Sequence, residues 1–431
     1  MKLIEEVLSK ENLNKAYLQV FRNKGSAGVD GVSVNELKEH LRINGDKIVE
    51  DILNRKYKPL PVKRVEIPKD NGKKRLLGIP TVVDRVIQQA IAQKLSPIYE
   101  NEFSDNSYGF RPKRSCEMAI IKSLEFMNDG HDWIVDIDLE RFFDTVNHDR
   151  LIQIIYRTID DGDIMSLISK YLKAGVMVQG KLEKTKLGTP QGGNLSPLLS
   201  NIMLNELDKE LESRGLRFVR YADDCNIYVG SEKAANRVMK SITKFIEKKL
   251  GLIVNASKSK VGRPRDIKFL GFGYYYDAKE KRYEVKPHEV SIQKFKRKLK
   301  RLTKRSWSIS LDKRLLKLKQ LIKGWVNYFR IAKMKTILNK IDSKVRNAIR
   351  VVIWKQWKVS IRQIKSLIKL GIDEEQAKGI TWCRRGYQYI SHSWIIQRAI
   401  SNKRLEKRGL VSARDHYLKI HTVISIEPPC T

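Results

Sequence analysis

The sequence predicts a mixed α/β body that extends to about residue 290 and is followed by a helical, strongly basic extension. Strand-like runs, glycine turns and clustered acids lie before this point, and long stretches with helical periodicity lie after it. From Ser291 to Thr431 there are 35 Lys+Arg against 8 Asp+Glu, a net charge of +27, out of +36 for the whole chain. That much like charge is costly unless a polyanion offsets it, so a nucleic-acid partner is expected.

Length and composition exclude several classes of protein. A chain of 431 residues with 41% hydrophobic residues can form two to four domains with real cores, which excludes disorder as its main state. The uncharged stretch from Gly188 to Asn205 contains two prolines and adjacent glycines, so no membrane span is predicted. Four cysteines without a C-x-x-C pair predict neither a disulfide framework nor a zinc module. The N-terminus has no long apolar core of a secretory signal, so a cytoplasmic location is expected.

Two amphipathic helices are predicted in the basic extension, over residues 315–329 and 337–352. Apolar residues recur there at steps of three and four, which predicts one buried stripe on each helix. The basic residues off these stripes are Arg314, Lys317 and Lys323 in the first run and Lys340, Lys344 and Arg350 in the second. A solvated face would explain the lysines of one helix, but the charge of the whole extension favours a surface for a polyanion.

Clustered acids mark the part of the chain with the most chemical information. The apolar run from Trp133 to Ile137 predicts a buried strand that contains Asp136 and is closed by Asp138. Two β-rich runs flank Asp223-Asp224, which predicts a hairpin with both acids at its tip. Neighbouring carboxylates repel unless a cation neutralises them, and Mg²⁺ is typically held by carboxylates together with substrate phosphates. An ordinary polar turn is the alternative for Asp223-Asp224 taken alone, so the surrounding sequence must decide.

A series of motifs supplies this context over almost the whole chain. They are NKGSAGVDGVS (Asn23 to Ser33), KRVEIPKDNGKKRLLGIPTVVDRVIQQAI (Lys63 to Ile91), NSYGFRPKRSC (Asn106 to Cys116), IVDIDLERFFDTV, LGTPQGGNLSPLLSNIMLNELD (Leu187 to Asp208), FVRYADDC, GLIVNASKSKV, KFLGF (Lys268 to Phe272) and GWVNYF (Gly324 to Phe329). In this order they resemble the motifs of the reverse transcriptases encoded by group II introns, also called maturases. Several independent motifs in one order are more specific than any one of them.

The resemblance implies an α+β right-hand polymerase fold, with fingers, a palm built on an antiparallel sheet, a helical thumb and a small helical basic C-terminal region. The implied domains are an N-terminal extension and fingers (1–130, with part of the fingers interleaved with the palm), the palm (131–290), a thumb or maturase domain (291–370) and a DNA-binding-like region (371–431). The C-terminal region resembles that of members lacking the endonuclease domain, so no zinc-dependent nuclease is expected.

The resemblance also implies that Asp138, Asp223 and Asp224 are catalytic and hold two Mg²⁺ ions. Two ions roughly 4 Å apart would activate an attacking 3′-hydroxyl and stabilise the pyrophosphate leaving group.

The choice between Asp136 and Asp138 follows from the implied steric gate. In reverse transcriptases an aromatic gate lies five residues after the catalytic aspartate, and from Asp138 that position is Phe143, whereas from Asp136 it is Arg141. Asp138 is therefore the better match, and Asp136 and Asp144 are assigned to structural hydrogen bonding. A ring at Phe143 would clash with a 2′-hydroxyl, so deoxynucleotides should be selected.

The implied nucleotide-binding residues are Lys69, Arg75, Phe143, Gln191 and Lys258. Lys69 and Arg75 flank an Asn71-Gly72 turn, which predicts paired strands that reach over a triphosphate; a basic hairpin in solvent is the alternative. Gln191 is an implied contact near the nascent base pair. Lys258 would give a proton or charge to departing pyrophosphate, with a plain surface lysine as the rival interpretation.

The implied nucleic-acid contacts lie on both sides of residue 290. Those to primer and template are Arg111, Gly192, Phe269, Leu270 and Gly271, and those of the thumb to RNA are Lys317, Lys323, Lys340 and Lys344. A core hairpin would explain the apolar residues of the 269–272 segment equally well.

The expected function is that of an RNA-directed DNA polymerase, a nucleotidyltransferase that copies intron RNA into DNA and binds that RNA to assist splicing and mobility. The alternative is a primarily non-catalytic, RNA-binding splicing cofactor. The expected partners are group II intron RNA, an RNA template with a DNA primer, dNTPs and a DNA target. A membrane is not expected, the setting would be a bacterial-type cytoplasm, and a homodimer on RNA is left open.

Overall fold

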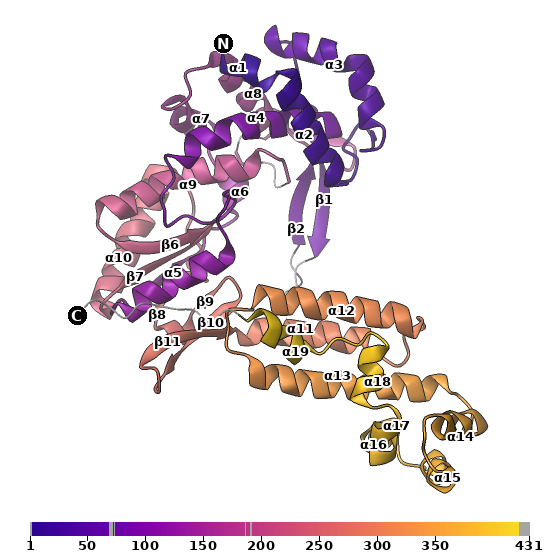
Figure 1. The fold of residues 1–431 in the computed structure, drawn as a ribbon. Helices are drawn as coiled ribbons and strands as arrows, with labels where there is room; N and C mark the ends of the chain where they lie inside the picture. Colours follow the sequence, from indigo (N-terminus) through magenta and orange to yellow (C-terminus); the bar gives the residue numbers. More distant parts are fainter. Residues whose placement is uncertain (1, 69–71, 73, 186, 190–191, 422–431) are drawn as a thin grey trace. The chain divides into compact units, whose positions relative to one another are not determined.

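The computed structural model describes residues 2–68, 72, 74–185, 187–189 and 192–421. They form two compact units, Met1–Arg263 and Pro264–Thr431 (Figure 1). Helices combine with mainly antiparallel sheets, which confirms the predicted α+β class. The last strands of the predicted palm, up to residue 290, belong to the second unit, and the four domain boundaries stay predictions.

The N-terminal end of the first unit is helical. Its helices are α1 (Leu3–Val7), α2 (Lys10–Arg22), α3 (Leu37–Leu53), α4 (Val82–Glu100), α7 (His148–Tyr156) and α8 (Gly162–Lys173). Helix α4 is buried on most sides because α1, α2 and α3 all pack against it. Its start is fixed by Thr81, whose hydroxyl accepts a hydrogen bond from the Asp84 backbone N–H and donates to the Asp84 carboxylate. Tyr57 donates to the same carboxylate, so the buried acid joins α4 to the segment before β1.

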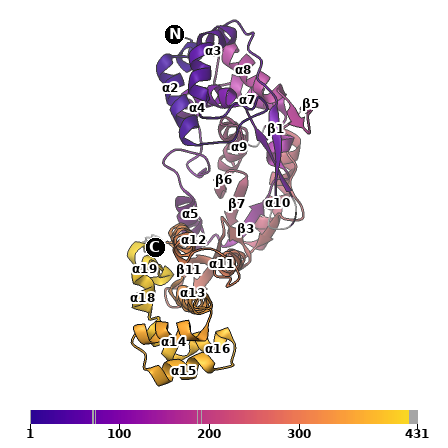
Figure 2. The same ribbon diagram turned by 90° about the vertical axis from the view of Figure 1, so that its right-hand side faces the viewer.

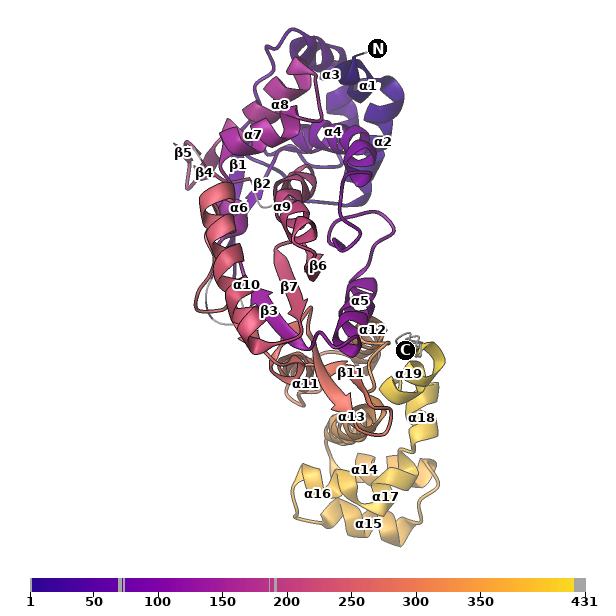
Figure 3. The same ribbon diagram turned by 90° about the vertical axis from the view of Figure 1, so that its left-hand side faces the viewer.

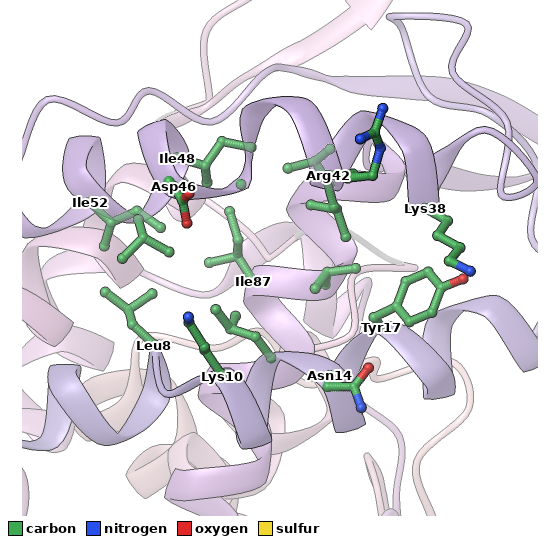
Figure 4. A pocket seen from close by; sticks show the side chains of 16 residues that line it. Leu8, Lys10, Asn14, Tyr17, Lys38, Arg42, Asp46, Ile48, Ile52 and Ile87 are labelled. Atoms are coloured by element: carbon green, nitrogen blue, oxygen red, sulfur yellow. The ribbon is translucent and has the colours of Figure 1, made fainter.

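Helices α2, α3 and α4 enclose an apolar pocket of about 470 Å³. Figure 4 shows Leu8 and Ile52 at one end of this pocket, Tyr17 with Lys38 at the other, and Ile87 between them. The pocket brings together none of the predicted site residues.

The first sheet has the strand order β2-β1-β4-β5. Its strands are β1 (Val62–Pro68), β2 (Lys74–Ile79), β4 (Val176–Val178) and β5 (Lys181–Glu183). Strands β1 and β2 pair antiparallel from Lys63↔Ile79 to Pro68↔Lys74, which confirms the paired strands predicted around Asn71-Gly72.

The second sheet is antiparallel, with the order β6-β7-β3-β8. Its strands are β3 (Trp133–Ile137), β6 (Arg217–Tyr221), β7 (Asp224–Val229) and β8 (Lys260–Gly262), and the helices of this part are α5 (Cys116–Asn128), α6 (Phe142–Thr145), α9 (Ser196–Ser213), α10 (Glu232–Phe245) and the π-helix η1 (Ile246–Leu250). Helix α10 packs along β3, β7 and β8 (Figure 3), and α5 packs on β6. Strand positions 135, 137, 225 and 227 all contribute buried apolar side chains to the core.

The second unit begins with a small sheet and continues with helices, as predicted for the extension. The sheet is β9 (Lys268–Phe269), β10 (Phe272–Asp277) and β11 (Arg282–Pro287), after the 3₁₀-helix η2 (Pro264–Asp266); the helices are α11 (Glu289–Leu302), α12 (Leu311–Tyr328), α13 (Lys335–Gln356), α14 (Ser360–Lys369), α15 (Glu374–Trp382), α16 (Tyr387–His392), α17 (Trp394–Ala399), α18 (Asn402–Lys407) and α19 (Ala413–Ile420). Helices α12 and α13 contain the two predicted amphipathic runs, and α19 packs against both. Figure 2 shows α14, α15 and α16 gathered together, and α16 packs against α13.

Two basic residues that were predicted to lie off the apolar stripes are buried instead. The guanidinium of Arg314 donates hydrogen bonds to the carbonyls of Leu302, Lys304 and Trp307. Arg350 donates to the Ile400 carbonyl, so it joins α13 to the loop after α17. These arginines satisfy loop carbonyls that would otherwise be buried without partners, a use that helical periodicity alone does not reveal.

No helix among the described residues has the length and apolar character that crossing a bilayer requires.

Gly109 lets the chain approach the β6–β7 hairpin closely. The segment just before it extends the sheet, because the Tyr108 N–H donates to the Arg220 carbonyl at 2.9 Å. A Cβ atom at Gly109 would lie 2.2 Å from the backbone nitrogen of Ala222, which is far inside van der Waals contact. Any side chain there must push the two backbone segments apart.

We therefore expect Gly109→Ala to destabilise the first unit by about 1–3 kcal/mol, the usual cost of overpacking. The control is Gly45→Ala, because Gly45 lies within α3 with open space around it and alanine favours helix. Thermal unfolding should show a lower midpoint for the first variant and an unchanged or higher one for the second. Equal midpoints for Gly109→Ala and the unmodified protein would contradict this packing.

Candidate active site

The pairing of β3 with β7 brings the predicted acids together from separate parts of the chain. In this antiparallel ladder Ile137 lies opposite Cys225 and Asp136 lies opposite Asn226. One step further along, Asp138 follows the end of β3 beside Asp224, the first residue of β7. Because side chains alternate along a strand, Asp136 and Asp138 are on the same face of the sheet.

A two-residue turn places Asp223 at the tip of the β6–β7 hairpin. Tyr221 and Asp224 form the last pair of the ladder, so that only Ala222 and Asp223 make the turn. Ala222 has φ +58, the left-handed conformation that the favoured two-residue hairpin turns require. Asp223 therefore lies at the tip as predicted, whereas Asp224 already belongs to β7.

A buried ion pair between Arg220 and Asp208 stabilises this turn from the core side. Arg220 donates from Nε to Oδ1 of Asp208 on α9 at 2.7 Å, and both side chains are 0% exposed. The same guanidinium donates to the carbonyl of Ala222 at 3.0 Å and to Oδ1 of Asn201 at 3.1 Å. Burial raises the pKa of Asp208, and the charge of Arg220 opposes that shift. Our sequence reasoning did not single out Arg220, although a charged residue inside an apolar strand is a usable signal.

Asp138 is bound by the segment that precedes β8. Nζ of Lys258 lies 2.9 Å from Oδ1 and 3.0 Å from Oδ2 of its carboxylate. The Asp138 backbone N–H donates to the Ser259 hydroxyl at 3.0 Å, and the Asp138 carbonyl accepts from the Asn255 N–H at 2.8 Å. The predicted nucleotide-binding lysine thus contacts a predicted catalytic carboxylate directly.

The charges of these groups act on one another. Burial raises the pKa of Asp223, the carboxylate of Asp138 raises it further, and the cations of Arg75 and Lys258 lower it. Burial and the nearby charge of Asp224 raise the pKa of Asp136 to about 6. Carboxylates that shift one another in this way are close enough to repel, which is the electrostatic condition that favours a bound cation.

The chemistry of these donors fits Mg²⁺, which prefers carboxylate oxygens. In the part of the chain that the structure describes, no three His, Cys, Asp or Glu side chains are gathered closely enough to hold a metal ion as they stand. Both Asp138 oxygens are instead taken by the Lys258 ammonium. A metal ion held by Asp138 together with Asp223 and Asp224 would compete with that ammonium for the same carboxylate.

The predicted steric gate lies on α6 beside the glycine loop. The ring of Phe143 is half-buried and meets Phe142 edge to face, with ring centroids 5.2 Å apart. The Thr189 N–H donates to the Phe143 carbonyl at 2.6 Å, and Gly188 has φ +93 with no room for a side chain above the same carbonyl. Phe143, Arg64 and Thr189 line a pocket of about 260 Å³ between this loop and the first sheet.

The structure places the other predicted nucleotide-binding residues, and the predicted primer or template contact Gly192, as follows. Arg75 is on β2 and its charge reaches Asp223. Gly192 has φ +120, and a Cβ there would lie 2.7 Å from the Gly78 carbonyl, so the backbone at Gly192 passes close to β2. Lys69 and Gln191 lie outside the described residues.

Arg111, a predicted contact to primer or template, is a buried residue. Its side chain is 2% exposed and pairs with Glu100 at 2.8 Å. It also donates to the carbonyls of Ser104 and Ser107. Arg111 therefore holds the 104–111 loop together from inside, and its contact with primer or template stays a prediction.

The predicted primer-contacting hairpin belongs to the second unit. Leu270 and Gly271 form its turn, with φ values of +49 and +84, and the Phe269 side chain is buried. Tyr328 donates its hydroxyl to the Leu270 carbonyl at 2.8 Å, and Ser291 donates to the Gly271 carbonyl at 2.8 Å. Helices α11 and α12 thus fix the turn, and the core interpretation holds for Phe269.

The thumb signature Gly324 to Phe329 contributes mainly to packing. Trp325 stacks on Phe295 with centroids 4.4 Å apart, and Phe329 packs on Phe272. Of the four predicted RNA-contacting lysines, three are exposed and Lys323 is half-buried. Their contacts with RNA stay predictions.

Comparison with known proteins identifies the class. Residues 67–274 match the family model described as "Reverse transcriptase (RNA-dependent DNA polymerase)", and residues 292–368 match the model described as "Group II intron, maturase-specific domain". These two segments contain the candidate site and helix α12.

Three curated relatives extend the match. The protein is 34% identical to Protein YkfC of Escherichia coli over 322 residues, which are 65% of this chain and 84% of YkfC. It is 42% identical to the group II intron-encoded protein LtrA of Lactococcus lactis over 213 residues, 48% of this chain and 34% of LtrA. It is 32% identical to the putative COX1/OXI3 intron 2 protein of Saccharomyces cerevisiae, over 62% of this chain and 37% of that protein.

The fold is thus that of the reverse transcriptases. Within that class, the chain belongs to the family of group II intron-encoded reverse transcriptases and maturases. The chain spans about a third of the length of LtrA and of the yeast protein.

The buried ion pair behind the turn can be tested by stability. Asp208→Asn would leave the Arg220 guanidinium buried without its counterion, so we expect a loss of about 3–5 kcal/mol in the free energy of unfolding. The control is Glu206→Gln on the same helix, which removes a partner of Arg157 whose side chain is 65% exposed. That change should cost no more than about 1 kcal/mol. Urea unfolding measures both, and similar small losses would show that Arg220 does not depend on Asp208.

Proposed function

We propose that this protein is an RNA-directed DNA polymerase that copies intron RNA, with Asp138, Asp223 and Asp224 as its catalytic carboxylates. The observation that carries the proposal is the β3–β7 register, which brings Asp138 beside the 223–224 turn. The match of residues 67–274 to reverse transcriptases supports it from the sequence.

The three carboxylates would hold two Mg²⁺ ions. When bound, such ions lower the pKa of an attacking 3′-hydroxyl and neutralise charge on the departing pyrophosphate. The raised pKa of Asp223 supports this use, because a carboxylate that is costly to keep charged gains most from a bound cation.

The residues around the acids would bind and select the nucleotide. The positive charge of Arg75 on β2 is close enough to lower the pKa of Asp223. Arg75 would therefore bind the triphosphate of a nucleotide held beside this acid. Phe143 presents a ring beside the glycine loop, where it would exclude a 2′-hydroxyl. Lys69 and Gln191 are proposed to bind the same nucleotide on the strength of the family resemblance alone.

A second function, RNA binding that assists splicing, is favoured by the maturase-specific match over residues 292–368. The net charge of the extension supports it, because exposed lysines on α12 and α13 can neutralise phosphates. We propose that one molecule performs both functions and that intron RNA is the shared partner. A DNA primer and a DNA target are proposed as further partners of the polymerase.

The two functions separate by mutation. In the variant Asp223→Asn/Asp224→Asn, primer extension on an RNA template with dNTPs and Mg²⁺ should fall by about a thousandfold or more, because the metal-binding charge is removed. Affinity for intron RNA should change little, because RNA binding is assigned to the second unit.

The control for that variant is Asp160→Asn, an exposed acid on the same unit, which should extend primers normally. Extension that persists in the double variant would contradict the site assignment, and a parallel loss of RNA binding would contradict the separation of functions.

The sugar gate gives an independent prediction. Phe143→Val should increase ribonucleotide incorporation relative to deoxynucleotide by about tenfold to a hundredfold, the range that a single steric contact supplies. The neighbouring Phe142→Leu changes a buried ring next to it and should leave the ratio unchanged. Steady-state kinetics with matched dNTP and rNTP pairs measure both, and an unaltered ratio in Phe143→Val would exclude the gate.

A further inference from the structure

The Lys258 ammonium stands where the proposed function requires a metal ion. It lies at hydrogen-bond distance from both oxygens of Asp138, 2.9 and 3.0 Å, so that neither oxygen is left to coordinate a second cation without competition. The Asp138 side chain is 28% exposed and the Lys258 side chain 63% exposed, so the ammonium approaches from the solvent side. A metal ion would approach the carboxylate from the same open side.

The backbone holds Lys258 in this place. The segment before β8 runs beside the end of β3, with a bridge between Leu139 and Val254 and a bond from the Glu140 N–H to the Ile253 carbonyl at 2.8 Å. The Asn255 N–H donates to the Asp138 carbonyl at 2.8 Å, and the Lys258 N–H donates to the Asn255 carbonyl at 3.1 Å. The contact therefore follows from an ordered segment, and only the flexible lysine side chain needs to move for the ammonium to leave.

The ion pair between Lys258 and Asp138 is weak enough for a divalent cation to displace the ammonium. Ion pairs with so much exposure are weak, because water screens the charges and the long side chain loses freedom on binding. A divalent cation that several carboxylates share gains more from the same oxygens than a single ammonium does. The ammonium can thus neutralise Asp138 in the free protein and still be displaced.

We propose that Lys258 is an exchangeable counterion of Asp138, which occupies the carboxylate in the free protein and leaves it when a divalent cation binds. The inference rests on the proposed function and adds a competition that this function does not require. Lys258 then acts as a positioning residue toward the metal, since it holds Asp138 beside the 223–224 turn and lowers the affinity for metal. Once released, its side chain is available to the phosphates of a nucleotide.

Comparing Lys258 with its neighbour Lys260 distinguishes direct competition with the metal ion from a general effect of positive charge on metal affinity. Lys260 lies opposite Asp136 on β8, and its charge lowers the pKa of that acid. Removing either lysine takes one positive charge from the region, and removing Lys258 also takes away the ammonium that is bonded to Asp138. Lys260→Met is therefore the matched control for Lys258→Met.

The first test measures the binding of Mn²⁺, as a spectroscopic substitute for Mg²⁺, to the full chain by electron paramagnetic resonance without nucleotide. Lys258→Met should bind Mn²⁺ more tightly by up to about fivefold, the ratio that an exposed ion pair can supply. Lys260→Met should change the affinity less than twofold. An unchanged affinity in Lys258→Met, or an equal gain in both variants, would overturn the exchange.

The second test follows the lysine itself. An amine-reactive label quantified by mass spectrometry should modify Lys258 more rapidly when Mg²⁺ is added, because its ammonium leaves Asp138. Exposed Lys317 on α12 is an internal reference that should not change. A labelling rate of Lys258 that stays constant while metal binds would overturn the proposal.

The variant Asp138→Asn separates failure of this inference from failure of the proposed function. If Asp138→Asn still binds Mn²⁺ as tightly as the unmodified protein, the metal assignment of the proposed function is wrong. If it loses Mn²⁺ and Lys258→Met behaves as the unmodified protein, only the exchange is wrong.

Discussion

The antiparallel pairing of β3 with β7 is the constraint on which the rest of the site depends. Strand geometry fixes Asp138 beside Asp224 once Ile137 lies opposite Cys225, and a slip of one residue would turn Asp138 to the opposite face of the sheet. The register is protected because the alternate positions of both strands are buried in the core. A packing interaction of apolar side chains thereby determines where charged side chains meet.

Two ion pairs stabilise this arrangement, and they differ in how much of each pair is exposed to solvent. The buried pair is permanent, and the exposed pair can be exchanged. The pair of Arg220 with Asp208 is fully buried, so that breaking it would leave an uncompensated charge; it fixes the turn permanently. The pair of Lys258 with Asp138 is exposed to water and weak, so a bound cation can displace the ammonium. One site can therefore combine a rigid buried pair, Arg220 with Asp208, and an exchangeable cation on its solvent side, Lys258.

The sequence predicts the elements of this protein better than the roles of its single charges. Alternating and helical periodicities predict β3, the β6–β7 hairpin, α12 and α13, because each pattern reports which side chains are buried. The burial of Arg111, Arg314 and Arg350 could not be predicted, because their partners are mainly backbone carbonyls, which side-chain periodicity does not report. The Lys258 contact could not be predicted either, because its partner lies 120 residues away and only the tertiary fold brings the two together.

The most direct test of the account maps the metal site on the protein itself. With Fe²⁺ in place of Mg²⁺, ascorbate and peroxide generate hydroxyl radicals at the bound ion, and these cut the nearby backbone. We expect cuts close to both residue 138 and residue 223, which excess Mg²⁺ suppresses together. Cleavage at only one of these segments, or cuts that Mg²⁺ does not suppress, would show that the carboxylates do not share a metal ion.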